Sequence, residues 1–329
     1  MTKSKIVKFL SGSIGILISI ALVWYIVKSY DLRQSWEIIT STSPWLYFSM
    51  VLVYLSTFYF RTLRWKLMLL NISKLNFGLL IKSIVLGFAG NNLIPARGGE
   101  LLRMEYFSKK TKIGRTTSFA SIVLEKILDA SVLLFFLFCA NLLLEARNEA
   151  IANTIKLASL FVLPVVLTLV ILRIKGHIFI HRIQQNEHKI FKLLGSKLEE
   201  VYSALLFLKF DRRTIQVIVL SLMIWLLEGL VFIIGIQSIG IDQLVFPIGM
   251  IALCIVNFGI LIPSSPGYIG VFQAAILIAL GSFGISETDS LAAAIIIHSS
   301  QFIPITLIGL MIFLFEYFRN QQSIINKAT

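Results

Sequence analysis

The feature that most constrains this chain is a series of apolar runs of about 20 residues each, separated by polar segments. A helix of roughly that length spans the hydrocarbon core of a bilayer and satisfies its own backbone hydrogen bonds there. Only 14% of the 329 residues are charged, whereas soluble domains have about 25%. The sequence therefore predicts an all-α polytopic membrane protein, with one integral membrane domain over residues 1–329.

Six runs are predicted to cross the membrane fully. They are residues 9–27, 44–60, 117–144, 155–172, 214–236 and 291–315. Lys and Arg collect on the cytoplasmic side of membrane proteins, so the basic flanks place both termini in the cytoplasm of a cell (inner) membrane. The net charge of +13 has the same origin, and we expect no nucleic-acid partner.

Two further apolar segments, residues 77–95 and residues 244–283, fit a different pattern. If residues 77–95 crossed the membrane, the basic segment after them would lie outside, against the positive-inside tendency. We therefore expect a re-entrant hairpin that enters from the cytoplasm and turns near Asn91, Asn92 and Pro95. The second segment has no Lys or Arg on either flank, and we expect it to enter from outside.

The two broken segments share a short motif, LIPARGGE at residues 93–100 and LIPSSPGY at residues 261–268. Inverted repeats with broken helices build the central sites of many secondary transporters. We therefore expect an inverted repeat with halves 1–150 and 151–329, each holding three full spans and one hairpin. The alternative is a pair of ordinary interfacial loops.

Residues 175–213, between the expected spans 155–172 and 214–236, are polar and basic. Within it, apolar residues recur at helical spacing from Ile190 to Leu208. This pattern predicts an amphipathic helix on the inner leaflet.

We expect a substrate to be bound by Asn91 and Asn92, by residues of the first motif, and by Glu125 and Asp129 in the span that follows. Arg97, Glu100 and Arg103 follow at helical spacing, and guanidiniums beside a helix N-terminus bind phosphate. Gly99 lets the backbone approach a ligand closely. The alternative is a positive-inside anchor with local ion pairs.

The span that follows contains Glu125 and Asp129, four residues apart and thus on one helix face. Carboxylates inside a membrane are costly and are functional candidates. They could pair with an arginine of the first motif, carry a proton or hold a hydroxylated headgroup; alternatively, both lie near the cytoplasmic end, where Lys126 can snorkel. We interpret Arg61 and Arg64, at the inner end of the second span, as snorkelling anchors.

The remaining candidates fall into two groups. The expected gate at the second hairpin consists of Pro263, Pro266, Gly267, Gly270 and Gln273. Glu228 and His298 are candidates for coupling transport to a proton or an ion. Glu228 has no charged neighbour in sequence, and the alternative for His298 is a packing role. There is no phosphate-binding loop, dinucleotide motif or metal-ligand spacing, so we expect no cofactor and no metal.

Three motifs, PARGGELLR, EKILDA and PSSPGYIGVFQAA, resemble the marks of the lysylphosphatidylglycerol synthase transmembrane-region family. Its members are described as flippase-like, and some are named dolichol-phosphate-sugar synthase-like. The resemblance covers nearly the whole chain. It implies the flippase-like membrane part alone, without the aminoacyltransferase domain of the full synthases.

The resemblance also implies which residues belong to each motif. The matching positions are Pro95, Arg97, Gly99, Glu100 and Arg103 in the first motif, Glu125 and Asp129 in the acidic pair, and Pro263, Pro266, Gly267 and Gly270 in the second motif. The chain departs from the family pattern at Lys126, where the family often has Arg, and at Phe272-Gln273, where it often has Arg-Glu. It also has His298 in a span where the family tends to have Arg. These departures leave the outer half of the site and the substrate open.

The leading hypothesis is a flippase-like transporter for an anionic or lipid-phosphate-linked amphiphile, either an aminoacyl phospholipid or a polyprenyl-phosphate sugar. The alternative is a membrane-embedded transferase that uses a lipid-phosphate donor, with Glu125 or Asp129 as general base. A third reading is an accessory subunit for a glycan- or lipid-modifying enzyme. The partners expected in each case are membrane lipids, anionic or phosphate-linked.

Cysteine labelling tests the expected topology. Cysteines that replace Lys74 and Lys110, on the two flanks of residues 77–95, are expected to be shielded from an impermeant thiol reagent in intact cells, because both flanks are cytoplasmic. Labelling of Lys110→Cys alone would show that residues 77–95 span the membrane, and it would contradict the inverted repeat.

Overall fold

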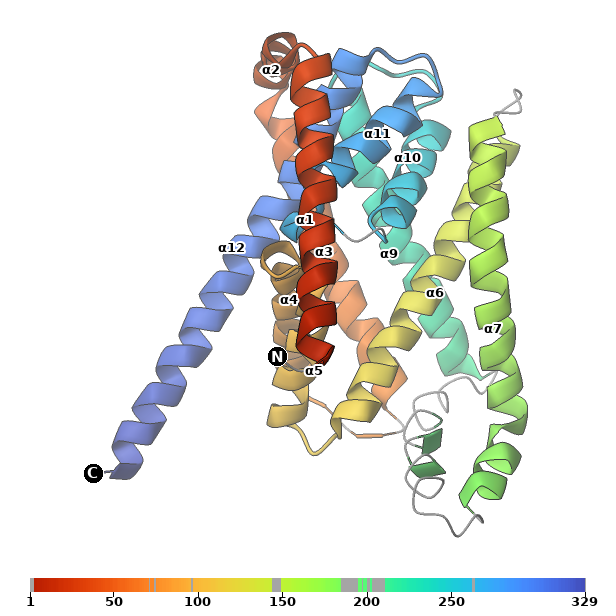
Figure 1. The fold of residues 1–329 in the computed structure, drawn as a ribbon, viewed down its shortest axis with the longest axis vertical. Coiled ribbons are helices and arrows are strands. Elements are labelled where there is room, and N and C mark those ends of the chain that lie inside the picture. Colours follow the sequence, from red (N-terminus) through yellow and green to blue (C-terminus); the bar gives the residue numbers. More distant parts are fainter. Residues whose placement is uncertain are drawn as a thin grey trace.

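The computed structural model describes residues 3–70, 72–73, 75–95, 97–143, 149–184, 195–196, 198–199, 202, 211–261 and 264–328. Within them every regular element is a helix, as predicted (Figure 1). In chain order the helices are α1 (Lys3–Ser29), α2 (Leu32–Ser41), α3 (Pro44–Leu69), α4 (Phe77–Leu93), α5 (Gly98–Lys110), α6 (Arg115–Leu142), α7 (Glu149–Gln184), α9 (Arg212–Gln237), α10 (Val245–Gly259), the short 3-10 helix η1 (Pro266–Tyr268), α11 (Val271–Gly281) and α12 (Glu287–Ala328).

Several of these helices are suited to cross a membrane. Among the described residues, three are long and apolar enough by themselves: Pro44–Leu69, Arg212–Gln237 and Glu287–Arg319. A pair within α7, Val162–Thr168 and Arg173–Ile183, bends by 62° and would add a fourth. The chain is thus a multi-pass membrane protein, and the total of six full spans stays a prediction.

Residues 77–95 were predicted to hold a whole hairpin, but they form only its first arm, and the return arm is α5. Pro95 ends α4 because proline restricts the residue before it to an extended backbone, and Ile94 has φ −112° and ψ 127°. Arg97 then takes a left-handed conformation with φ 55°, which non-glycine residues rarely adopt. The chain turns back as α5, which packs against α4.

A second hairpin is formed by α10 and α11, with η1 at its turn. Gly267 and Gly270 have φ values of 69° and 89°, and glycine adopts this region at little steric cost. The Gln273 side chain accepts a hydrogen bond of 2.8 Å from the Gly270 amide and starts α11. Pro263, predicted as part of this break, lies outside the described residues.

The two hairpins lie in opposite halves of the molecule, α4–α5 in the lower half of the view and α10–α11 in the upper half (Figure 1). Their turns meet, since α4 contacts η1. Around them α3 packs along α9, α4 against α12 and α6 against α10. The largest fully buried side chains between these helices include the apolar Trp65 and Phe232 but also two arginines, Arg64 and Arg103.

The segment between α7 and α9 is described only in part. The predicted span 155–172 lies within α7, whereas most of the predicted amphipathic helix from Ile190 to Leu208 lies outside the described residues. Where this segment meets α9, the backbone amides of Thr214 and Arg213 donate to the Asp211 carboxylate and hold the pKa of Asp211 below its usual value. This N-cap fixes the start of α9.

Gly99 tests the close packing of the first hairpin. A Cβ added there would overlap the Gly87 carbonyl oxygen and the Asn91 amide nitrogen of α4, so Gly99→Ala is expected to destabilise the protein by about 1–3 kcal/mol. The matched control is Gly281→Ala, because a Cβ at Gly281 meets nothing within 4 Å. Thermal unfolding in detergent measures both, and equal midpoints would contradict the packing.

Candidate functional site

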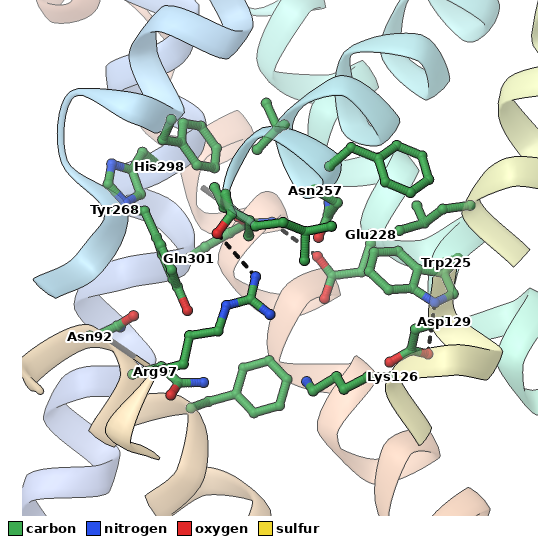
Figure 2. Close-up of a pocket in the computed structure, with 18 of the residues that line it drawn as sticks. Asn92, Arg97, Lys126, Asp129, Trp225, Glu228, Asn257, Tyr268, His298 and Gln301 are labelled. Carbon is green, nitrogen blue, oxygen red and sulfur yellow. Dashed lines mark hydrogen bonds between the residues drawn. The ribbon is translucent and has the colours of Figure 1, made fainter. Parts of the chain in front are cut away.

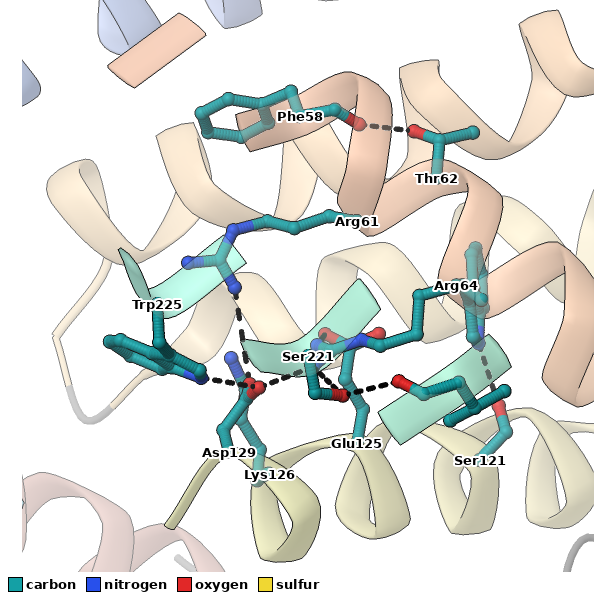
Figure 3. Close-up of polar contacts among 12 residues, drawn as sticks. Phe58, Arg61, Thr62, Arg64, Ser121, Glu125, Lys126, Asp129, Ser221 and Trp225 are labelled. Atoms are coloured by element: carbon teal, nitrogen blue, oxygen red, sulfur yellow. Dashed lines mark hydrogen bonds and ion pairs between the residues drawn. The ribbon is translucent and has the colours of Figure 1, made fainter. Parts of the chain in front are cut away.

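Two arginines of α3 lie at the centre of the helix bundle, one turn apart on one face. The exposed fraction is 3% for Arg61 and 0% for Arg64. Their interpretation as snorkelling anchors was therefore wrong: α6 and α9 cover them, and their guanidiniums reach carboxylates instead of the membrane surface. Figure 3 shows both guanidiniums beside Asp129.

Each of these arginines has a carboxylate partner on another helix. Arg61 Nη2 donates to Glu228 Oε1 of α9 at 2.8 Å, and Arg64 Nη1 donates to Asp129 Oδ1 of α6 at 2.6 Å. The Trp225 indole N–H also donates to Asp129 Oδ1, at 2.9 Å (Figure 3). Glu228, which has no charged neighbour in sequence, thus finds its partner through the fold.

A third pair joins α5 to α6. Arg103 Nη1 and Nη2 donate to the two oxygens of Glu125, each at 3.0 Å, and the guanidinium carbon lies 4.0 Å from the centre of the Trp65 ring. Arg64 Nη2 lies 3.8 Å from Glu125 Oε1 and links this pair to the other two. We call the three arginines and three carboxylates the buried ion network: Arg61, Arg64, Arg103, Glu125, Asp129 and Glu228.

The buried ion network is electrically balanced. Two buried charges taken out of water cost several kcal/mol each unless they pair with good geometry, and removing one partner costs about 3–5 kcal/mol. The bidentate geometry at Arg103 is the strong form of such a pair. Arg103 and Glu125, both predicted to bind substrate, are 1% and 0% exposed and hold α5 on α6 instead.

Beside this network, the turns of the two hairpins enclose a central pocket of about 180 Å³ (Figure 2). Five of the predicted substrate-binding residues line it: Asn91, Asn92, Arg97, Glu100 and Asp129. Gly99 does not, and it serves the contact of α5 with α4. Glu228 and His298 also line the pocket, together with residues not predicted, namely Asn257, Tyr268 and Gln301.

Arg97 differs from the other arginines of the site. Its Nη2 donates to the Ile260 carbonyl oxygen at 3.1 Å, and its guanidinium carbon lies 6.0 Å from the centre of the Tyr268 ring (Figure 2). It forms no ion pair with any residue that the structure describes. Of the pairings considered between an arginine of the first motif and Glu125 or Asp129, the described residues thus contain that of Arg103 with Glu125 but none with Arg97.

Glu100 does have a cation beside it. Lys126 Nζ lies 3.2 Å from Glu100 Oε1 and 5.1 Å from the centre of the Phe88 ring, so Lys126 turns into the site instead of snorkelling. Asn91 Nδ2 donates to the same oxygen at 3.3 Å. Asn91 Oδ1 is buried and accepts no hydrogen bond from the described residues.

Polar contacts with α12 hold both hairpins at the pocket. Asn92 Nδ2 donates to Thr306 Oγ1 at 2.8 Å. From the second hairpin, Gln273 Nε2 lies 3.0 Å from His298 Nδ1, and the His298 ring stacks on Phe272 at 4.4 Å. The expected gate residues Pro266, Gly267 and Gly270 form the second turn but do not line the pocket.

A second, apolar cavity of about 490 Å³ opens between α5, α6 and α7. We call it the lateral groove; its apolar lining is Leu101, Phe119, Ile122, Val123, Ile127, Ala130 and Val162. The groove and the central pocket share Arg97, Glu100, Lys126 and Ala130, so the two adjoin each other at these side chains. Among the described residues, no group of three or more His, Cys, Asp and Glu side chains is placed to hold a metal ion.

Comparisons with known proteins agree with a membrane function. The family model described as "Lysylphosphatidylglycerol synthase TM region" matches residues 12–309. The chain is 22% identical over 324 residues to UPF0104 membrane protein MJ1595 of Methanocaldococcus jannaschii, with 94% of this chain and 95% of that protein covered. It is 20% identical over 329 residues to glycosyltransferase AglD of Haloferax volcanii, with 90% of this chain covered but only 52% of that protein. No solved structure matches.

The buried ion network makes a prediction about stability. Arg103→Met leaves Glu125 without its bidentate partner and is expected to cost about 3–5 kcal/mol. The double variant Arg103→Met/Glu125→Met removes both charges and is expected to recover most of that loss. Unfolding in detergent measures both; additive losses in the double variant would contradict the pairing.

Arg115→Met is the matched control for the loss of an arginine. Its guanidinium pairs with Glu105 at 2.6 Å, but the Arg115 side chain is 65% exposed. Exposed pairs contribute about 0–1 kcal/mol, so Arg115→Met is expected to leave the unfolding midpoint nearly unchanged.

Proposed function

The chain belongs to the lysylphosphatidylglycerol synthase transmembrane-region family, and we propose that it is a flippase-like transporter for a lipid with an anionic, phosphate-bearing headgroup. The observation that carries the proposal is the position of Arg97. Its guanidinium lies in the central pocket against a backbone carbonyl, whereas the other arginines of the site are paired with carboxylates. A guanidinium in this setting binds phosphate through charge-assisted hydrogen bonds.

The lateral groove supports a lipid as the substrate in preference to a small soluble anion. Its lining is almost entirely apolar, and it meets the central pocket at Arg97, Glu100 and Lys126. Burial of an apolar chain in such a groove is favourable by roughly 25 cal/mol per Å². The headgroup then occupies the central pocket while an acyl or polyprenyl chain lies between α5, α6 and α7.

The two hairpins are the moving parts of the proposed transporter. We interpret the two halves of the chain as an inverted repeat in which α4 corresponds to α10 and α6 to α12. Such a two-fold relation requires that a contact of α4 with α12 be matched by a contact of α10 with α6, and both contacts are present. The basic residues around the α4–α5 hairpin favour the cytoplasmic side for it. Rocking of one repeat against the other would expose the pocket to each leaflet in turn.

A membrane-embedded transferase is the second candidate, because one relative is named a glycosyltransferase. This chain spans about half the length of that relative. In addition, the two carboxylates considered as general bases, Glu125 and Asp129, already accept hydrogen bonds from Arg103 and Arg64, which leaves them poorly placed to take a substrate proton. These contacts favour transport.

Arg97→Gln tests the proposed function. Glutamine keeps a hydrogen-bond donor on the side chain but lacks the positive charge of the guanidinium. The loss of a hydrogen bond between charged groups, here with the lipid phosphate, costs about 1.5–3 kcal/mol. We expect the rate of translocation of a fluorescent anionic phospholipid in proteoliposomes to fall by about 10- to 100-fold at subsaturating lipid. The unfolding midpoint is expected to fall much less than in Arg103→Met, because Arg97→Gln weakens one hydrogen bond to the Ile260 carbonyl and breaks no buried ion pair.

Arg115→Gln, an exposed arginine remote from the pocket, is the control and is expected to translocate the lipid at the wild-type rate. Unchanged translocation by Arg97→Gln would refute the assignment of Arg97 to the phosphate. A wild-type protein that translocates no anionic phospholipid and no polyprenyl phosphate would refute transport itself.

A further inference from the structure

We infer that the headgroup bound in the central pocket is a phosphate ester whose remaining polar part is uncharged and hydroxylated, and that a cationic aminoacyl headgroup is rejected. This inference rests on the proposed function and specifies its substrate class. It follows from which charges of the pocket are already paired within the chain.

Every carboxylate that lines the central pocket has a cation of the chain beside it. The pairs are Glu100 with Lys126 at 3.2 Å, Asp129 with Arg64 at 2.6 Å and Glu228 with Arg61 at 2.8 Å. Among the described lining residues, Arg97 is the charged side chain that lacks an opposite charge. The pocket therefore complements one negative charge of a ligand and offers no unpaired carboxylate to a positive one.

A cationic headgroup would meet two unfavourable terms in this pocket. Its ammonium group would lose water without gaining an unpaired carboxylate, and it would lie near the unpaired guanidinium of Arg97, where like charges repel strongly because the site is screened little by solvent. Competition for Glu100 would in turn leave Lys126 without its partner. Each of these lowers the affinity for an aminoacylated lipid.

The uncharged part of the lining suits hydroxyl groups. Side-chain amides surround the pocket at Asn91, Asn92, Asn257 and Gln301, and amides both donate and accept hydrogen bonds. The amide nitrogens of Asn92, Asn257 and Gln301 already donate within the chain, to Thr306, the Leu253 carbonyl and Glu228. Their amide oxygens are therefore the groups that would accept hydrogen bonds from ligand hydroxyls. A glycosyl or glycerol group on a phosphate has this chemistry.

The test compares two lipids with identical chains, dioleoylphosphatidylglycerol and its lysyl ester, titrated against the purified full-length protein in phosphatidylcholine nanodiscs. The first has an anionic phosphate and a hydroxylated, uncharged head; the second adds two ammonium groups. We expect the wild-type protein to bind the first lipid at least about tenfold more tightly, because a tenfold ratio corresponds to about 1.4 kcal/mol, within the range of one charged hydrogen bond.

Lys126→Gln provides the decisive variant. It removes the cation beside Glu100, and the unpaired carboxylate that remains can accept an ammonium group, so the preference for phosphatidylglycerol is expected to shift by about tenfold or more toward the lysyl ester. The double variant Glu100→Gln/Lys126→Gln removes both charges. It keeps the net charge of the pocket and is expected to retain the wild-type preference.

The outcomes separate the inference from the proposed function. Equal or tighter binding of the lysyl ester by the wild type, or a Lys126→Gln preference identical to that of the wild type, would overturn the headgroup assignment while leaving a lipid transporter intact. Binding of neither lipid, and of no polyprenyl phosphate, by the folded wild type would overturn both. Unfolding midpoints of all variants establish that each is folded.

Discussion

Three arginines buried between apolar helices determine the positions of the elements around them. A guanidinium cannot lose its proton in a protein, so each one in a low-dielectric setting needs a carboxylate at hydrogen-bond distance. The arginines come from α3 and α5 and the carboxylates from α6 and α9. Sliding any of these helices by one turn, about 5.4 Å, would separate several charges at once, so the buried ion network fixes the register of four helices.

The helix breaks then create a pocket in this fixed frame. Pro95 and the glycines at positions 267 and 270 keep both hairpins short, so their turns meet beside the network. Non-helical backbone deep in a membrane protein must be covered by protein or face a wet cavity. Arg97 meets this need by donating to the carbonyl of Ile260, at the C-terminal end of α10, where helix carbonyls lack intrahelical partners.

The helical class, the family and the approximate break positions follow from local sequence patterns, and these predictions were correct. The PARGGE motif also led to Arg97 and Glu100, which line the pocket. The partners of Arg61, Arg64 and Glu228 were missed because they lie far away in sequence; Arg61 and Glu228 are 167 positions apart. The sequence contained one indication of these pairs. Arg61 and Arg64 lie on one helix face, Glu228 has no charged neighbour in sequence, and each of them requires an opposite charge when it is buried.

In the proposed transport cycle, Arg97 would connect phosphate binding in the pocket to motion of the hairpins. The same guanidinium that would bind a phosphate now donates to the Ile260 carbonyl of the other hairpin, and its backbone is held in the left-handed region, a conformation that costs of order 1–3 kcal/mol and persists only where surrounding contacts enforce it. A phosphate oxygen that takes over this hydrogen bond would remove one contact between the two turns. A ligand shifts a conformational equilibrium only by its difference in affinity for the two states, and competition for Arg97 supplies such a difference. In this proposal the ion pairs of the buried ion network stay intact while Arg97 exchanges the Ile260 carbonyl for a phosphate. The charges that stabilise the fold are then separate from Arg97, the charge that changes its partner.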